Sequence, residues 1–439
     1  MAKIHIRTYG CSANTHEAEA MAGLLANEGN AATITCDSEN SGDEISADII
    51  IANVCTVKGD NKALREIRRI KEKYPDKKLI ISGCVTSQML PIIKNNFPGT
   101  AIVNTDNITD IVEAKNKLLE GKIVEIVSRK QEVKIKLPKI RKNPAVSIVP
   151  ISDGCSQVCT YCSVRQVKGK LHSYPVEKII SEVENSVDDG CREIWLTSQD
   201  NGAYMTDAEK ESTLPELIEK ICSIEGNFKV RIGMINPTHI NENNLQKFIE
   251  AFKHEKVFKF LHLCVQSGNN DILKKMVRWY TVEQFEGIVN EFRKHIPEIT
   301  VSTDIICGFP SETMEQFMDS VELVKRIKPN ALNISRFHAR PETAAARMKQ
   351  DVHGNESKNR SQILTKEFEK MALERNRKWI GWKGKILIDE IGKNNTMVGR
   401  NYCYKPVVIE GKISDYPFGT EIDVEVVDAF TYWLKGRVV

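Results

Sequence analysis

The stretch "GCSQVCTYCSV", residues 154–164, places three cysteines at spacings of four and three residues, directly after the apolar run "SIVPIS". An apolar run of this kind predicts a buried strand, so Cys155, Cys159 and Cys162 are expected on the loop that leaves it. A structural zinc site needs four ligands, and His172 is the nearest candidate in sequence for the fourth. Three thiolates on a four-iron cubane instead leave one iron open to another ligand. The triplet therefore predicts an iron–sulfur cluster with a free coordination position.

Around this stretch, a series of six strand candidates predicts the fold of the central region. Helical patterns such as "PVEKIISEVENSVDDG" separate them, with apolar residues at helical spacing. Six such units predict a partial (βα)6 barrel over residues 143–375, with its chemistry at the carboxyl ends of the strands. The candidates are "AVSIVPIS", "REIWLTSQ", "KVRIGMIN", "FLHLCVQS", "TVSTDIIC" and "ALNISRFH".

Residues 1–120 predict a separate, doubly wound α/β domain, because the strand candidates "KIHIRTYG", "ADIIIANVC", "KLIISGC" and "TAIVNTDN" alternate with helical patterns. Cys11, Cys55 and Cys84 each follow one of the first three strands. Since parallel strands end at one edge of a sheet, these thiols are expected to converge on a second three-thiolate cluster. The alternative is three unconnected core cysteines. The other six cysteines are expected to pack in cores: Cys36, Cys191, Cys222, Cys264, Cys307 and Cys403.

Residues 376–439 predict a small closed β-barrel. A long charged helix, expected over 357–379, leads into short runs that alternate apolar and polar residues between Gly and Asn turns. Small antiparallel barrels of this size often hold nucleic acid, although a structural cap is the alternative. Several aromatic side chains there could stack on unpaired bases or fill the barrel core: Tyr402, Tyr404, Phe430, Tyr432 and Trp433.

Composition and charge limit the class of protein. The chain has 439 residues, 41% of them hydrophobic and 28% charged, and a net charge of +3. It has no signal-like start and no apolar run long enough for a membrane span, so a cytoplasmic protein without disulfides is expected. Residues 121–142 hold eight Lys or Arg against two Glu, and residues 61–78 hold eight against three acidic residues. The first segment is interpreted as a basic connector whose Lys134, Lys136, Lys139, Arg141 and Lys142 contact RNA phosphates; a solvated surface is the alternative.

The spacing C-x3-C-x2-C resembles that of radical S-adenosylmethionine (SAM) enzymes, in which the open iron chelates SAM. The resemblance implies that Tyr161, just before the third cysteine, packs against the adenine of SAM; packing on the barrel rim is the alternative. Polar residues at the expected ends of barrel strands are further candidates for SAM contacts: Ser198, Gln199 and Asp200 after the second, Gln266 after the fourth, and Asp304 in the fifth. Each could instead be a helix cap or a turn residue.

Over the whole chain, the motifs "YGCSAN", "CTVK", "GCV" and "CSQVCTYC", followed by a barrel like the RNA-binding TRAM module, resemble the methylthiotransferases. "EIWLTSQDNGAY", "RIGMINP", "VQSG" and "TDIICGFPSET" are most similar to the archaeal and eukaryotic branch, which acts on N6-threonylcarbamoyladenosine at position 37 of tRNA. The resemblance implies two [4Fe–4S] clusters and two SAM molecules, one to methylate a sulfur held at the N-terminal site and one to activate the base. Three positions depart from the family pattern: Met205, Cys264 and the segment "RPETAAARM".

The resemblance also implies partners and leaves rivals open. The partners are the tRNA anticodon loop, an electron donor such as a flavodoxin or ferredoxin, and a sulfur donor. A methylthiotransferase that modifies isopentenyladenosine 37 or a ribosomal protein aspartate would share every cysteine. A noncatalytic iron–sulfur protein that binds RNA is the rival from another class. It predicts closed four-thiolate clusters, and each triplet here lacks a fourth cysteine.

Overall fold

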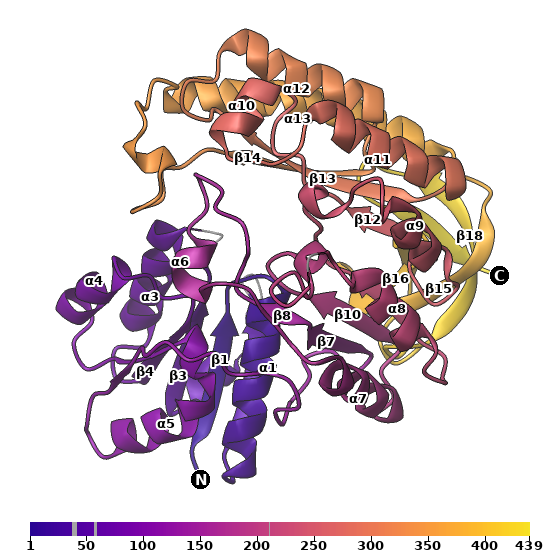
Figure 1. Cartoon of the computed structure of the whole chain (residues 1–439). Helices are drawn as coiled ribbons and strands as arrows, with labels where there is room; N and C mark the ends of the chain where they lie inside the picture. Colours follow the sequence, from indigo (N-terminus) through magenta and orange to yellow (C-terminus); the bar gives the residue numbers. More distant parts are fainter. Residues whose placement is uncertain (37–41, 57–58, 210) are drawn as a thin grey trace.

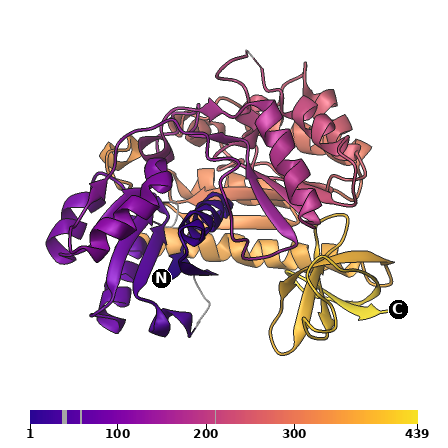
Figure 2. The ribbon, with the colours of Figure 1, turned by 90° about the horizontal axis from the view of Figure 1, so that it is seen from below.

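The computed structural model describes residues 1–36, 42–56, 59–209 and 211–439. Its N-terminal domain lies beside an arc of barrel strands and helices (Figure 1). A view from below places this domain and the C-terminal barrel at opposite sides of the molecule, with the long helix α13 (Gly354–Arg377) running between them (Figure 2). Within the described part of the chain, no helix is both long and apolar enough to cross a membrane.

The N-terminal domain is the doubly wound α/β domain that the sequence predicts. Its parallel strands lie in the order β2-β1-β3-β4-β5-β6. Alternate residues of β3 pack into different cores: Ile49 and Ile51 face α1 and α5, whereas Ile50 and Ala52 face α3 and α4. The strands are β1 Lys3–Thr8, β2 Ala31–Cys36, β3 Ile49–Val54, β4 Lys78–Gly83, β5 Ala101–Asn104 and β6 Glu125–Ile126. The helices are α1 Ser12–Asn27, α2 Asp43–Ser46, α3 Asp60–Lys73, α4 Met89–Asn96 and α5 Ile111–Leu119, with a 3-10 helix η2 Thr105–Asp110.

The basic connector, residues 121–142, is part of the N-terminal fold and is not a free linker. Its strand β6 pairs with β5, so the sheet extends beyond the expected boundary at residue 120. Further along, the connector packs against α1, where the backbone at Pro138 approaches Gly23 so closely that an added Cβ would come within 2.2 Å of the Pro138 oxygen. Glycine at position 23 is therefore what lets the connector cross α1.

The central region is an open barrel of six parallel strands, as predicted. Two three-stranded sheets, β11-β10-β7 and β12-β13-β14, are joined by single bridges such as Ile235 to Leu263. The strands are β7 Val146–Pro150, β10 Glu193–Thr197, β11 Lys229–Ile232, β12 Phe260–His262, β13 Thr300–Cys307 and β14 Ala331–Arg336, with a small hairpin of β8 Ser152–Asp153 and β9 His172–Ser173. The helices are α6 Val164–Lys168, α7 Val176–Asp188, α8 Leu214–Cys222, α9 Leu245–Lys253, α10 Asn270–Lys275, α11 Val282–His295, α12 Met314–Ile327 and α13, with 3-10 helices η3 Asn201–Ala203, η4 Pro237–His239 and η5 Ala345–Arg347.

The C-terminal region is a closed five-stranded barrel in the order β15-β16-β17-β19-β18. One feature differs from the predicted antiparallel barrel: β17 and β19 pair in parallel. This pairing closes the barrel, because β19 inserts between β17 and β18. The strands are β15 Lys383–Ile391, β16 Thr396–Arg400, β17 Pro406–Glu410, β18 Glu421–Ala429 and β19 Leu434–Val438.

Candidate active site

The three central cysteines lie on the loop between the β8 strand and α6, beyond the end of the first barrel strand. Gly154 opens this loop with φ +75°, where an added Cβ would come within 2.0 Å of the Lys170 carbonyl oxygen. The Cys162 backbone NH donates to the Cys159 carbonyl over 3.1 Å, so the chain makes a tight turn between these two cysteines. Burial raises the pKa of Cys155 to about 12 and that of Cys162 to about 11. Both thiols are therefore protonated near neutral pH until a metal displaces the proton.

The three N-terminal cysteines converge at the edge where their strands end. Cys11 follows β1 and Cys55 follows β3, and these neighbours flank the point where the strand order reverses. Such switch points are where doubly wound sheets bind ligands. A hydrogen bond with Cys55 lowers the pKa of Cys11 to about 6, and burial raises the pKa of Cys84 to about 11. Cys11 also acts electrostatically on Cys84, so the three thiols face a common space.

The spacing of both triplets fits a multi-iron cluster better than a single ion. Two thiolates bound to one zinc ion at about 2.3 Å each cannot be more than about 4.6 Å apart. Neither triplet has all three sulfur atoms within 4.8 Å of one another, although all six cysteines belong to the described residues. In a cubane, each thiolate binds a different iron, so wider spacing is tolerated. The residues present thus fit two clusters.

Two hydrogen bonds tie the triplets together across the domain boundary. Ser12, next to Cys11, shares a hydrogen bond of 2.6 Å with Thr197 at the end of β10. Arg340, beyond β14, donates from Nη1 to the carbonyl of Thr56, over 2.9 Å. The positive charge of Arg340 also partly offsets the effect of burial on the pKa of Cys162. The arginine therefore acts on both sites.

A buried ion-pair network lies under this boundary. Lys168, at the end of α6, pairs with Glu17 of α1 over 2.5 Å, and Lys134 of the connector pairs with Asp153 of β8 over 2.5 Å. Burial opposes the charge on Lys168, but Asp153 and Glu17 raise its pKa well above the usual value. Asp153 directly precedes Gly154, so the network fixes the start of the cysteine loop against α1.

The second barrel strand ends in the polar residues that the sequence singled out. Ser198 Oγ accepts a hydrogen bond from the Asp200 NH over 3.2 Å, the geometry of a turn residue. Asp200 is buried; it accepts from the Asn236 NH over 3.1 Å and lies 3.2 Å from His239 Nε2. Gln199 is different, because its buried Oε1 has no hydrogen-bond partner among the residues that the structure describes. A buried amide oxygen without a partner is a candidate contact for a ligand donor.

Tyr161 and Gln266 have clear local roles. Tyr161 packs against the buried side chains of Met276, Phe309 and Ala345 on the barrel rim. Gln266 adopts φ +72°, which is rare for a residue with a Cβ and costs roughly 1–3 kcal/mol. Its NH donates to the Asp304 carbonyl over 2.8 Å, so this strained residue links the fourth and fifth strands.

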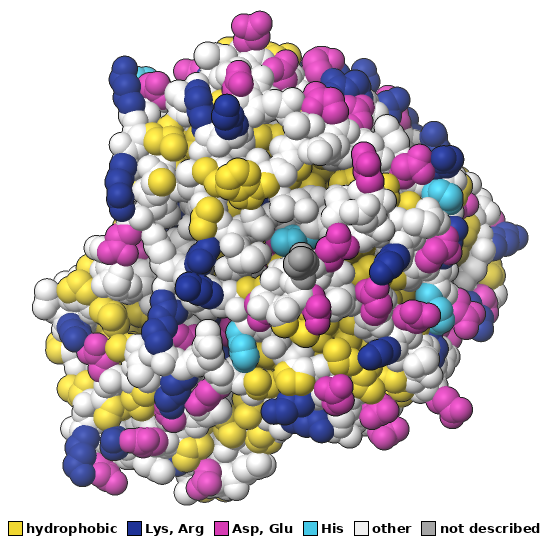
Figure 3. Space-filling model, in the orientation of Figure 1, with side chains coloured by type: hydrophobic (Ala, Val, Ile, Leu, Met, Phe, Trp, Pro, Cys, Tyr) yellow, Lys and Arg dark blue, Asp and Glu magenta, His cyan; other side chains and the backbone are white. Residues whose placement is uncertain are grey.

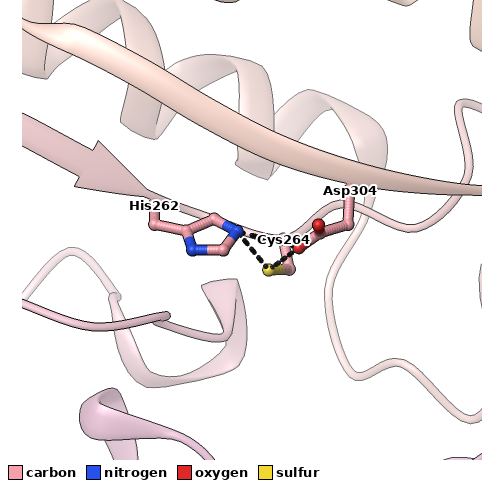
Figure 4. A group of neighbouring side chains, drawn as sticks. All are labelled: His262, Cys264 and Asp304. Atoms are coloured by element: carbon pink, nitrogen blue, oxygen red, sulfur yellow. Dashed lines mark hydrogen bonds and ion pairs between the residues drawn. The ribbon is translucent and has the colours of Figure 1, made fainter. Parts of the chain in front are cut away.

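Cys264 is buried, as expected of a packing residue, but its thiol also contacts polar side chains. Its sulfur contacts the carboxylate of Asp304 and lies 3.5 Å from Nε2 of His262, which itself lies 2.9 Å from Asp304 Oδ2 (Figure 4). Burial and Asp304 together raise the pKa of the Cys264 thiol well above its usual value. The alternation H-x-C in the predicted strand "FLHLCVQS" was the sequence signal for this group, since it predicts both side chains on one face, although the observed β12 ends at His262. Four of the other expected packing cysteines are buried and Cys36 is half-buried: Cys191, Cys222, Cys307 and Cys403.

The connector's lysines fall into two kinds, which corrects their assignment as a common RNA-binding set. Lys134 and Lys139 are buried in ion pairs, the latter with Glu182, so neither ammonium group can reach a phosphate. Arg141 is half-buried and pairs with Asp189 over 2.9 Å. Lys136 and Lys142 are exposed and remain candidates. On the face shown in Figure 3, Lys and Arg side chains gather beside the hollow between the N-terminal domain and the barrel.

The aromatic side chains of the C-terminal barrel fall into two groups, one at an interface and one exposed. Tyr404 packs between the two barrels, with ring centroids 4.9 Å from Phe258 and 5.2 Å from Phe260, so it is an interface residue. Phe430 stacks on Trp433 at 4.0 Å while remaining partly exposed. Tyr402 and Tyr432 are also exposed. Tyr402, Phe430 and Tyr432 therefore remain candidates for stacking on unpaired bases.

The open six-strand barrel and the cysteine loop on its first strand define a radical SAM protein. The model of the radical SAM superfamily matches residues 149–324, and that of the uncharacterized protein family UPF0004 matches residues 3–105. A cobalamin-binding radical SAM methyltransferase, TsrM of Kitasatospora setae, has a similar fold. Its TM-score is 0.53 at 13% identity, over 79% of this chain and 74% of that one.

Full-length relatives identify the family more closely. The chain is 39% identical to the probable threonylcarbamoyladenosine tRNA methylthiotransferase of Pyrococcus horikoshii, over 100% of both chains. It is 37% identical to the probable enzyme of that name from Methanothermobacter thermautotrophicus, over 93% of this chain and 94% of the relative. The threonylcarbamoyladenosine tRNA methylthiotransferase of Homo sapiens is 34% identical over 100% of this chain and 74% of its own length. The chain belongs to the threonylcarbamoyladenosine tRNA methylthiotransferase family.

Proposed function

We propose that this protein adds a methylthio group to C2 of N6-threonylcarbamoyladenosine at position 37 of tRNA. The observation that carries the proposal is the pairing of two three-cysteine sites across one boundary, where Ser12 contacts Thr197 and Arg340 contacts Thr56. A reaction that joins a sulfur-bearing site to a radical-generating site needs the two to share one substrate space. Membership of the family supplies the choice of base.

The target bond explains why a radical cofactor is needed. C2 of adenine carries a C–H bond that no side-chain base of ordinary pKa can break near neutral pH. [4Fe–4S] clusters bound by Cys155, Cys159 and Cys162 and by Cys11, Cys55 and Cys84, together with SAM, would supply the radical and the sulfur chemistry. The protein's own contribution is to position the base and to exclude water from it.

Several side chains of this chain suit that task. Arg278 donates to Cys159 Sγ over 3.4 Å, and hydrogen bonds to cluster sulfurs tune the reduction potential. The Gln199 oxygen, which has no hydrogen-bond partner among the described residues, offers an acceptor, and Asp304 offers a carboxylate within the fifth strand. We assign Gln199, Gln266 and Asp304 to SAM or substrate contacts, and Tyr161 to the wall beside the SAM adenine.

The RNA surface in this proposal combines three regions. Lys136 and Lys142 contact phosphates, the exposed Tyr402 and Tyr432 stack on unpaired bases, and the C-terminal barrel acts as a TRAM-like module. A low-potential electron donor such as a flavodoxin or ferredoxin and a source of sulfur complete the reaction. The proposal places the enzyme in the cytoplasm, where it meets tRNA.

Anaerobic reconstitution tests the proposal. The loaded protein is incubated with SAM, dithionite, sulfide and tRNA that carries threonylcarbamoyladenosine, and the nucleosides are analysed by mass spectrometry. The expected product is 2-methylthio-N6-threonylcarbamoyladenosine. Parallel reactions contain tRNA with isopentenyladenosine or ribosomal protein as substrate, so a product in either of those alone would reassign the enzyme. A fully loaded protein that forms no methylthio product on any of the three would be a noncatalytic binder.

A further inference from the structure

We propose that His262, Cys264 and Asp304 form a site for one divalent cation of the zinc type, separate from the two cysteine triplets. In the part of the chain that the structure describes, this is the only group of His, Cys, Asp or Glu with three ligand atoms within 4.8 Å of one another. A single ion requires that closeness, because all its ligands must lie within about 2.0–2.3 Å of one point. The inference does not depend on the methylthiotransferase reaction; with the ion bound, Asp304 would act on SAM or substrate through that ion and not by direct contact.

The strands bring the three donors together. His262 ends β12 and Cys264 follows two residues later, and both side chains lie beside Asp304 (Figure 4). β12 and β13 run in parallel with His262 opposite Ser302, so Asp304 lies two residues further on, level with Cys264. The imidazole Nε2 and the carboxylate Oδ2 are 2.9 Å apart, and the sulfur is 3.5 Å from Nε2 (Figure 4).

Neighbouring groups hold two of the donors in place. Asn333 donates from Nδ2 to the second carboxylate oxygen of Asp304 over 2.6 Å, which leaves Oδ2 for an ion. The carbonyl of Cys264 accepts from Arg278 Nη2 and from Tyr280 Oη, both over 3.0 Å, so the backbone that carries the thiol is fixed. Outer hydrogen bonds of this kind orient the ligands of built metal sites.

The donor set selects the kind of ion. One thiolate, one imidazole and one carboxylate suit zinc or cobalt(II), whereas calcium and magnesium take oxygen ligands. The two anionic donors would neutralise a divalent charge. Cys264 is buried, but the side chains of His262 and Asp304 are 18% and 24% exposed, so the open side of the group is accessible. A fourth tetrahedral position would be open to water or to a carboxylate oxygen of a ligand.

Zinc binding to the cluster-loaded protein tests the site. Protein with both triplets occupied is given one equivalent of Zn²⁺ under anaerobic conditions and desalted, and its zinc and iron are counted by mass spectrometry. We expect about one zinc per chain with unchanged iron. X-ray absorption at the zinc edge should then show one sulfur ligand among nitrogen and oxygen ligands. A sulfur-only shell would mean that zinc had entered a cysteine triplet, and that result, like a failure to retain zinc, overturns the proposal.

Matched variants make the test specific. Cys264→Ala should lose at least 90% of the zinc, whereas Cys222→Ala, at another buried cysteine, should keep it. Asp304→Asn provides a second test that leaves the thiol in place and should weaken zinc binding at least tenfold. In each variant an unchanged iron content shows that the protein is folded. Retention of zinc by both Cys264→Ala and Asp304→Asn would overturn the assignment.

Discussion

Arg340 and Thr56 meet across the boundary between the two cysteine sites, where the guanidinium donates to a carbonyl one residue beyond Cys55. The arginine comes from the far end of the barrel, after its last strand, so this hydrogen bond joins residues that are 284 positions apart. A hydrogen bond from a charged donor contributes roughly 1.5–3 kcal/mol. Loss of this contact should therefore reduce methylthio transfer, which needs both cysteine sites, more than SAM cleavage, which needs only the barrel site.

The first prediction follows from this contact. Arg340→Met should lower the yield of methylthiolated tRNA about tenfold or more, which corresponds to about 1.4 kcal/mol. SAM cleavage without tRNA should change much less, because its cysteine loop is held separately by the Lys134–Asp153 and Lys168–Glu17 ion pairs. Both products are measured in the same anaerobic reaction. Arg347→Met, at an exposed arginine of η5, is the control. An equal loss of both products in Arg340→Met would contradict the claim that Arg340 supports methylthio transfer more than SAM cleavage.

A second prediction concerns the barrel triplet. Replacing Cys155, Cys159 and Cys162 with Ala should halve the iron from about eight to about four per chain and abolish 5′-deoxyadenosine formation, since each triplet fits one four-iron cluster. Iron analysis and liquid chromatography of the nucleoside products check it. Wild-type iron in this variant would show that the triplet is not a cluster site.

The third prediction separates the two triplets. With Cys11, Cys55 and Cys84 replaced by Ala, the barrel loop should still assemble its cluster, because its ligands come from a region with its own core. This variant should cleave SAM but form no methylthio product. A soluble protein with wild-type circular dichroism is the control for folding. Retained methylthiolation would mean that sulfur is delivered elsewhere.

The fourth prediction concerns the exposed lysines of the connector. If Lys136 and Lys142 contact phosphates, the double variant with Ala should bind tRNA more weakly, and its salt dependence should flatten by about 0.7–0.9 per lost contact. Binding is measured at several salt concentrations. Lys247→Ala with Lys294→Ala removes two exposed charges from the outer barrel helices and should leave the slope unchanged. Equal slopes in both double variants would remove the connector from the RNA surface.

A fifth prediction concerns the buried lysine of the same segment. Lys139→Met leaves the carboxylate of Glu182 buried without its partner and should lower the free energy of unfolding by about 3–5 kcal/mol. Lys139→Met with Glu182→Gln should recover much of that loss, because no charge then remains unpaired. Denaturation followed by circular dichroism measures both. A loss below 1 kcal/mol in the single variant would show that the pair is solvated.

The strands of the fold could be predicted where apolar runs are continuous or alternate cleanly. "TVSTDIIC" coincides with β13 from its first to its last residue. β2 was missed because "AATITC" is short and half-exposed, and β6 because two residues in a basic segment carry no periodic signal. The parallel pairing of β17 with β19 could not be predicted either, since the alternation of a strand does not reveal the direction of its neighbour.

The places of the two cysteine triplets, on the loop beyond the first barrel strand and at the ends of the N-terminal strands, could be predicted from spacing and from strand ends, but burial could not. The connector's lysines have similar sequence surroundings, and only the fold shows that Lys134 and Lys139 are buried against acidic partners while the side chain of Lys136 is exposed. Cys264 was missed for a related reason. Its partner Asp304 is 40 positions away, and only the pairing of β12 with β13 brings them together.

The left-handed backbone at Gln266 has a consequence for attempts to make this protein more heat-stable. Glycine adopts that conformation without the steric conflict of a Cβ, so Gln266→Gly relieves strain of roughly 1–3 kcal/mol at the link between the fourth and fifth strands. A selection for heat resistance alone would favour this substitution and discard the amide at the mouth of the barrel. A screen for heat-stable variants of this enzyme therefore has to measure activity as well as stability.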